Sequence, residues 1–116
     1  MKRQIAETSG RAAENRAAAW LEAQGWRVLD RRRKTKRGEI DIVARHENVV
    51  VFVEVKWRRN AEQLELAIDE YRLRRVAAAA EAVAHEYARE GEDLRIDVLL
   101  LAPGAEPRHI VNAWMP

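Results

Sequence analysis

Cysteine is absent from this chain of 116 residues, and its absence excludes several kinds of site. A chain without Cys has no disulfide framework, no thiolate-bound zinc, no iron–sulfur cluster and no thiol nucleophile. Long apolar runs are missing as well, so no segment has the length of a membrane span. The residues from Met1 to Gln4 lead into no signal-peptide core. We therefore expect a cytoplasmic protein that has no membrane partner.

Lysine is scarce, at 4 residues against 17 Arg, and the basic residues are unevenly spread. The net charge is only +2, yet seven of the 21 basic residues lie between Arg27 and Arg37, with Asp30 as the only acid among them. A basic block on a nearly neutral chain indicates a surface that meets phosphates. A solvated basic loop explains the same charges, so charge alone does not decide between the two.

Hydrophobic periodicity predicts one domain, ordered as helix, three strands, helix and two strands. Ala13, Ala17 and Leu21 recur at helical spacing, and Gly25 is placed to end this helix. The predicted elements are a helix over residues 9–24 capped by Thr8 or Ser9, an extended run from residue 26, strands over 39–44 and 49–57, a helix from 68 or 69 to 89, and strands over 94–101 and 109–114. Residues 45–48 are expected to form a hairpin loop and residues 58–65 a polar connection.

Strand alternation places charged side chains on an otherwise apolar strand. Glu54 and Lys56 are two residues apart, so a strand carries both on one face, about 7 Å from each other. If the preceding hairpin loop has an even number of residues, Asp41 points to that face, opposite Phe52 or Glu54 depending on register. An odd number would turn Asp41 away. The other face of its strand is expected to carry Ile40, Ile42 and Ala44.

Two carboxylates and a lysine on one strand face suit the hydrolysis of phosphodiesters with a divalent metal ion. Oxygen ligands hold Mg²⁺ while leaving positions for water and for a phosphate oxygen. The ion lowers the pKa of a bound water and neutralises charge that develops on the phosphate. A desolvated lysine can orient or deprotonate that water, which an arginine cannot. The alternative interpretation is a salt-bridged strand face that has no chemistry.

Other candidate residues are less specific. Glu14 shares a helix face with Ala17 and Leu21, so it points either toward the sheet as a further ligand or into solvent. The three His residues are too scattered in the sequence to predict a metal triad. We expect Tyr71 and the Trp residues to lie in the core rather than to stack on bases.

At these residues the chain resembles a known family. GEIDIV at residues 38–43, followed by VFVEVKWR at residues 51–58, is similar to the signature of the YraN-type proteins. These are small bacterial proteins of the PD-(D/E)XK nuclease superfamily, which has the restriction endonuclease-like fold. Further matches are Gly10, Ala13, Glu14, Ala17, Leu21, Gly25, Trp26, Arg74, Arg75 and residues 95–98, so the resemblance covers nearly the whole chain.

The resemblance implies an α/β fold with a restriction endonuclease-like core of αβββαβ order, in which helices flank a mixed central sheet, as a single endonuclease-like domain over residues 1–116. It implies catalytic roles for Asp41, Glu54 and Lys56. It also implies a site for Mg²⁺ or Mn²⁺ whose ligands are Glu14, Asp41, Glu54 and the backbone carbonyl of Val55. Two departures concern substrate contacts: Arg32 stands where relatives often carry Asn, and Arg72 where many carry Lys.

We therefore expect a Mg²⁺-dependent nuclease that acts on DNA rather than RNA and that selects for DNA structure rather than base sequence. The side chains expected to contact nucleic acid are Arg31, Arg32, Arg33, Lys34, Lys36, Arg37 and Arg72. A resolvase would in addition need a homodimer. The alternative is a catalytically silent module that binds nucleic acid or protein and keeps the nuclease fold.

Overall fold

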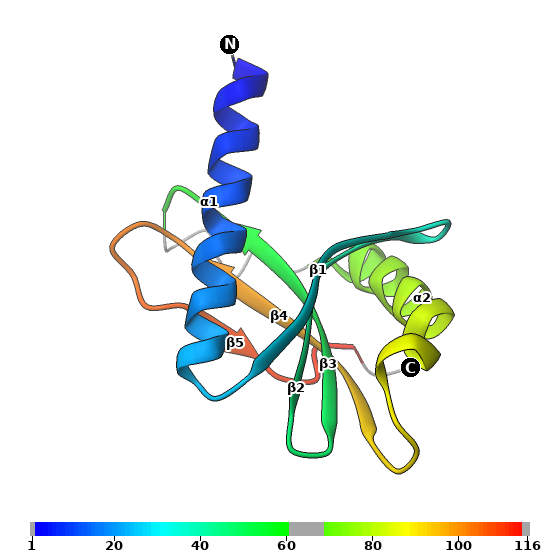
Figure 1. The fold of residues 1–116 in the computed structure, drawn as a ribbon. Coiled ribbons are helices and arrows are strands. Elements are labelled where there is room, and N and C mark those ends of the chain that lie inside the picture. Colours follow the sequence, from blue (N-terminus) through cyan, green and yellow to red (C-terminus); the bar gives the residue numbers. More distant parts are fainter. Residues whose placement is uncertain (1, 61–68, 115–116) are drawn as a thin grey trace.

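The computed structural model describes residues 2–60 and 69–114, with the side chains of the first helix described from Gly10 onward. Its elements are α1 (Lys2–Ala23), β1 (Arg27–Thr35), β2 (Gly38–His46), β3 (Val49–Trp57), α2 (Glu70–Tyr87), β4 (Asp93–Leu101) and β5 (Arg108–Ile110), shown in Figure 1. This is the element order expected from the sequence. The α/β class, with a mixed sheet flanked by helices, is confirmed and is compatible with a restriction endonuclease-like core.

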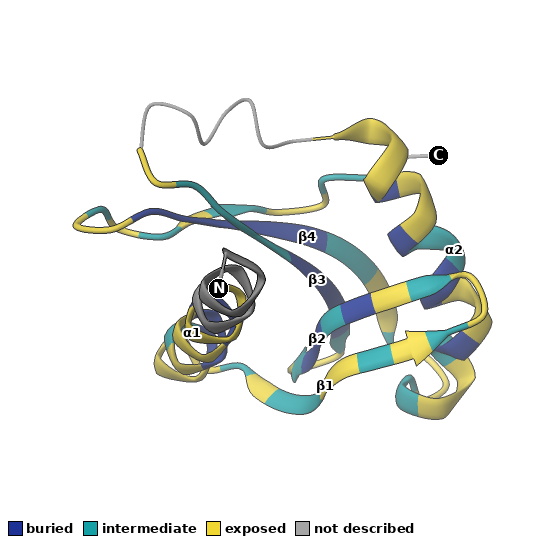
Figure 2. Ribbon diagram, turned by 90° about the horizontal axis from the view of Figure 1, so that it is seen from above, coloured by how far each residue is buried: buried dark blue, intermediate teal, exposed yellow. Residues whose placement is uncertain are grey.

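The five strands form one sheet in the order β1-β2-β3-β4-β5. β1, β2 and β3 pair antiparallel, β3 and β4 pair parallel, and β4 and β5 pair antiparallel. The parallel pair is joined through α2, because parallel neighbours need a long crossover connection. The buried residues of the sheet lie on β2, β3 and β4, while β1 at the edge has intermediate and exposed residues and no buried one (Figure 2).

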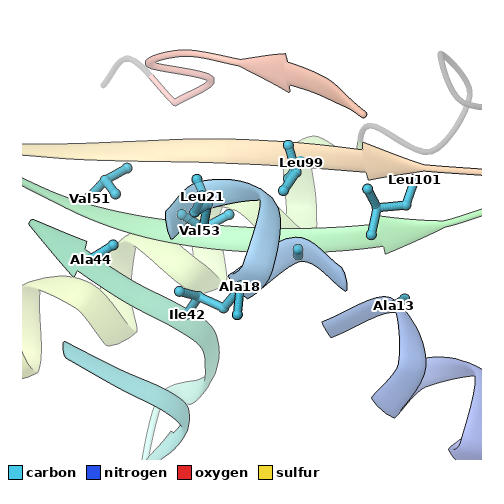
Figure 3. Packing of buried hydrophobic residues seen from close by; sticks show 10 residues of the cluster. Ala13, Ala18, Leu21, Ile42, Ala44, Val51, Val53, Leu99 and Leu101 are labelled. Atoms are coloured by element: carbon cyan, nitrogen blue, oxygen red, sulfur yellow. The ribbon is translucent and has the colours of Figure 1, made fainter. Parts of the chain in front are cut away.

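The two helices pack on opposite faces of the sheet. α1 buries Ala17, Ala18 and Leu21 against the odd-numbered side chains of β3, such as Val51 and Val53 (Figure 3). α2 covers the other face, where its buried Ala79, Ala80 and Val83 meet Val50 and Phe52. The small side chains on both helices allow close approach to the sheet, so a core with few large residues is still packed on both sides.

Gly25 ends α1 as expected, with φ of +98°. The Trp26 N–H donates to the carbonyl of Leu21, and the Gly25 N–H donates to the carbonyl of Glu22, which is the Schellman arrangement. The expected start of this helix is wrong, because α1 continues back to Lys2 and neither Thr8 nor Ser9 is an N-cap. Lys2, Arg3, Gln4, Ala6 and Glu7 in the added turns all have high helix propensity, which favours this extension.

Other boundaries shift by a few residues. β2 continues to His46, so the hairpin loop before β3 has two residues rather than the four expected. α2 starts at Glu70, with Asp69 as its N-cap, and the last strand ends at Ile110. The expected core position of Tyr71 is wrong: Tyr71 is 66% exposed, because Leu73 supplies the buried side chain of this turn. Most of the polar connection expected over residues 58–65, and Ile68, lie outside the described residues.

Asp97 on β4 is fully buried and joins β4 to the segment that follows β5. Arg95 donates two hydrogen bonds to its carboxylate, at 2.9 and 2.8 Å, and His109 Nε2 lies 2.6 Å from Asp97 Oδ2. The Asn112 N–H donates to the same group at 2.9 Å. This buried charge is therefore compensated on several sides, as a buried carboxylate requires.

Within the described part of the chain, no helix combines the length and the apolar character that crossing a membrane would need.

Candidate functional site

The candidate site lies at the end of β3 that follows Val53, where β2 and β3 stop pairing regularly. The paired residues end at Ile42 and Val53, so Asp41 and Glu54 are the next residues on their strands. The loop between the strands has two residues, Glu47 and Asn48, which meets the condition of an even loop. The register places Phe52 opposite Val43, which leaves Glu54 as the neighbour of Asp41.

The expected shared face of β2 is wrong at one position. Ile42 and Ala44 pack against α1, but Ile40 packs with Val43 in the cluster on the α2 side. The change of face coincides with Asp41, whose Oδ2 accepts a hydrogen bond from the Val55 N–H at 2.8 Å. A side-chain oxygen thus replaces a backbone carbonyl as the partner of this N–H, and strict alternation ends there.

Glu54 is a buried carboxylate with unequal partners for its two oxygens. Its side chain is 2% exposed, and Oε1 lies 3.3 Å from Lys56 Nζ and 3.1 Å from Arg72 Nη2. Oε2 has no hydrogen-bond partner among the described residues. A buried oxygen without a partner costs free energy, so this side chain has capacity for a further positively charged partner.

Asp41 lies among other carboxylates. Burial, the charge of Glu54 and the weaker influence of Glu14 and Glu39 raise the pKa of Asp41 to about 7, against an opposing effect of the hydrogen bond from Val55. Two carboxylates that hinder each other's ionisation in this way favour a bound cation, which relieves both burial and repulsion.

Glu14 is buried on α1 and points toward β1. Its Oε1 lies 3.2 Å from Arg31 Nη2 and accepts a hydrogen bond from Arg31 Nε, and its Oε2 lies 3.8 Å from Arg32 Nε. Of the two orientations left open by the sequence, solvation is therefore wrong. Glu14 borders the site while its charge is balanced by the basic strand.

Two hollows flank the acid pair and share Glu39 and Arg72 as walls. The larger, of about 440 Å³, is lined among others by Glu14, Asp41, Val55 and Lys56. The smaller, of about 220 Å³, is lined by Glu54 together with Gly38, Glu39, Arg72, Arg75 and Val76. Asp41 therefore faces one hollow and Glu54 the other.

The residues present fit a Mg²⁺ ion held by few protein ligands. Over residues 2–60 and 69–114, no three His, Asp or Glu side chains gather into a complete metal-binding cluster. Mg²⁺ does not require one, because it keeps several waters and is often bound by one or two carboxylates. Asp41 and Glu54 are two such carboxylates: the Oε2 of Glu54 has no hydrogen-bond partner among the described residues, and Val55 lines the same hollow as Asp41.

The basic residues expected to contact nucleic acid separate into two groups. Arg31 and Arg32 lie against Glu14, Arg33 Nη2 lies 2.9 Å from Glu86, and Arg72 lies against Glu54. The other three are exposed at the end of the β1–β2 hairpin, beside α2 in Figure 1, and make no ion pair with a described residue: Lys34, Lys36 and Arg37.

Several residues that line the two hollows were not among the candidate residues expected from the sequence. Arg11 and Arg58 line the larger hollow, and Arg75 lines the smaller. Arg58 ends the VFVEVKWR motif and Arg75 is one of the residues that match the YraN-type proteins, so the sequence could have indicated both. Arg11 gave no signal, because one Arg on an exposed helix face is common.

Comparison with known proteins gives consistent matches. The model of the family described as "Uncharacterised protein family UPF0102" matches residues 13–101, which include Asp41, Glu54 and Lys56. A UPF0102 protein of Erythrobacter litoralis is 67% identical over 116 residues, 100% of both chains. UPF0102 proteins of Sphingopyxis alaskensis and Rhizorhabdus wittichii are 56% identical over 100% of both chains and 51% identical over 97% of this chain and 96% of the relative.

Proposed function

This chain belongs to the UPF0102 family, and from its site we propose that it is a Mg²⁺-dependent nuclease that hydrolyses phosphodiester bonds in DNA. The observation that carries the proposal is the pair Asp41 and Glu54. Burial and the charge of Glu54 raise the pKa of Asp41, and Glu54 keeps a buried oxygen that has no hydrogen-bond partner among the described residues. A fold that retains such a costly pair gives up stability, which is typical of functional sites.

Asp41, Glu54 and the carbonyl of Val55 would hold the ion. Bound there, Mg²⁺ supplies a water of lowered pKa and neutralises charge on the phosphate. Lys56 Nζ, which is 3.3 Å from Glu54 Oε1, is placed to orient the attacking water. The water oxygen forms a bond to phosphorus and releases a proton to solvent, one P–O ester bond breaks, and the leaving sugar oxygen takes up a proton from solvent.

The test is incubation of the purified chain with linear, single-stranded, flapped and four-way DNA, in Mg²⁺, in Mn²⁺ and in chelator. We expect cleavage of at least one substrate with metal and none with chelator. Asp41→Asn and Glu54→Gln should abolish it, because each removes ligand charge at nearly constant shape.

Asp93→Asn is the matched control, because Asp93 is exposed at the start of β4, away from the site. We expect this variant to cleave DNA as the wild type does. Metal-dependent cleavage that persists in both site variants would point to a contaminating nuclease and contradict the proposal. DNA binding without cleavage on every substrate would instead support the silent binding module.

A further inference from the structure

The cations that surround the two hollows differ in whether a carboxylate already neutralises them. Arg11 and Arg58 line the larger hollow and Arg75 the smaller. None of the three forms an ion pair with an acid whose side chain is described, and the Arg58 guanidinium donates to the Trp57 carbonyl, at 2.8 Å. These three side chains come from α1, from the residue after β3 and from α2.

Two arginines of the basic block, Arg31 and Arg33, are engaged by other side chains of the protein. Arg31 is hydrogen-bonded to Glu14 and to Asn15, and Arg33 to Glu86. A guanidinium that leaves a carboxylate for a phosphate exchanges one ionic contact for another, so its net gain is small. An unpaired guanidinium gains the whole contact and releases a counterion from the nucleic acid.

The three arginines without an acid partner among the described side chains also lie on both sides of the acid pair. The hollow that Asp41 faces carries Arg11 and Arg58, and the hollow that Glu54 faces carries Arg75. An enzyme that cuts at the end of a DNA strand needs phosphate contacts on only one side of the cleaved bond. Cations on both sides fit a DNA strand that continues in both directions from that bond.

Resting on the proposed function, we propose that one DNA strand passes from one hollow to the other across Asp41 and Glu54. Arg11 and Arg58 hold its phosphates on one side of the cleaved bond and Arg75 holds them on the other. Arg31 and Arg33 instead fix β1 to the helices. The protein therefore cuts bonds inside a strand rather than at its ends.

The first test measures binding of a mixed-sequence single-stranded DNA across a series of salt concentrations, in chelator, so that it needs no cleavage. Each phosphate contact that a cation neutralises increases the magnitude of the slope of log affinity against log salt by about 0.7 for single strands. We expect Arg11→Gln/Arg58→Gln/Arg75→Gln to decrease the magnitude of this slope by about 2. We expect Arg31→Gln/Arg33→Gln to leave it within about 0.3 of the wild type.

Arg89→Gln is the control for loss of one exposed positive charge, because Arg89 lies between α2 and β4, at the opposite end of β3 from the site. Its slope should equal that of the wild type. Circular dichroism checks that each variant is folded, and single substitutions replace the double variant if removal of its ion pairs unfolds it. A larger slope change in the Arg31 and Arg33 variants than in the three hollow variants would overturn the proposal.

A second test uses covalently closed single-stranded circles. If the strand continues through both hollows, circles and linear strands are cut at rates within about threefold of each other. Cleavage of linear strands alone would overturn the two-sided arrangement while leaving the nuclease intact. If the salt slopes change as expected but neither substrate is cleaved, the proposed nuclease activity is contradicted and the proposed path of the DNA strand is supported.

Discussion

Asp41 is a carboxyl group whose near neighbours include three other carboxylates, and its raised pKa has a measurable consequence. Its pKa is about 7 in the folded chain against an ordinary 3.8, so between these values the folded state binds the proton more tightly than the unfolded state. Stability therefore falls as pH rises from about 4 to about 7 and stays reduced above that. Asn at this position escapes the penalty and can still accept the Val55 N–H.

We expect Asp41→Asn to raise the free energy of unfolding by about 1–3 kcal/mol at pH 8, measured without metal by urea denaturation. The gain should shrink toward zero near pH 4. A gain that did not depend on pH, or a loss of stability, would mean that the carboxylate repulsion at this site is unimportant.

Arg32 has a backbone conformation that an arginine adopts at a cost, with φ of +53° inside β1. Asn adopts this left-handed region more easily, because its short polar side chain bonds locally. The two ion pairs of Arg32, to Glu14 at 3.8 Å and Glu39 at 4.0 Å, are long and partly exposed. We expect Arg32→Asn to stabilise the chain by about 0.5–1 kcal/mol in thermal unfolding. Arg32→Gln, which lacks this backbone preference, is the control and should not stabilise.

Much of the site could be predicted from the sequence, because the positions of its side chains depend on residues that are near each other in the chain. Glu54 and Lys56 share a face by strand alternation alone, and an even loop predicts Asp41 as the neighbour of Glu54. Alternation along β2 is interrupted at Asp41, so Asp41 and Glu54 line different hollows instead of the one shared face that was expected. The partners of these side chains could not be predicted in the same way. Arg31 reaches Glu14, and Arg72 reaches Glu54, only through the packing of helices that are distant in sequence.

Among the elements, the short strand β5 depends on one buried charge. Burial alone would raise the pKa of Asp97, but hydrogen bonds from His109, Arg95 and the Asn112 N–H outweigh it and hold the pKa below its ordinary 3.8. A lowered pKa of this kind stabilises the fold above pH 4, and the stabilisation is lost as pH falls below that.

We expect Asp97→Asn to cost about 3 kcal/mol at pH 7, since it leaves Arg95 and His109 without their shared carboxylate. The difference from the wild type should decrease below pH 4. Urea denaturation at several pH values measures it, with Asp93→Asn as the neutral comparison on the same strand. An unchanged midpoint at pH 7 would show that Asp97 does not hold β5.

Element types followed from periodicity, while their ends depended on contacts that the sequence does not reveal. Apolar residues two apart predicted β2 and β3, and their hairpin tightened to two residues because the strands pair as far as His46 and Val49. Ile40 left its expected face because the Asp41 carboxylate accepts a backbone N–H. A polar side chain that replaces a backbone acceptor leaves no periodic signal.

For the whole molecule, the proposed ion should act as a stabilising ligand. Mg²⁺ that binds only the folded chain adds about 1.4 kcal/mol when the free ion is about ten times its Kd. For a domain of this size we expect a rise in Tm of roughly 5 °C, reversed by chelator. Glu54→Gln should remove most of this shift, and differential scanning calorimetry measures it. An equal shift in Glu54→Gln and the wild type would place the ion elsewhere.

The two-residue turn between β2 and β3 also bears on the order of folding. Asp41 and Glu54 are brought together by a hairpin of low contact order, whereas Arg72 arrives only with the crossover that pairs β3 with β4. Closing a short loop costs less entropy and occurs sooner than closing a long one. The two carboxylates therefore meet when only Lys56 lies beside Glu54 and Arg72 is not yet in place. Their repulsion would raise the free energy of a transition state in which this hairpin is already formed, so we expect the acid pair to slow folding.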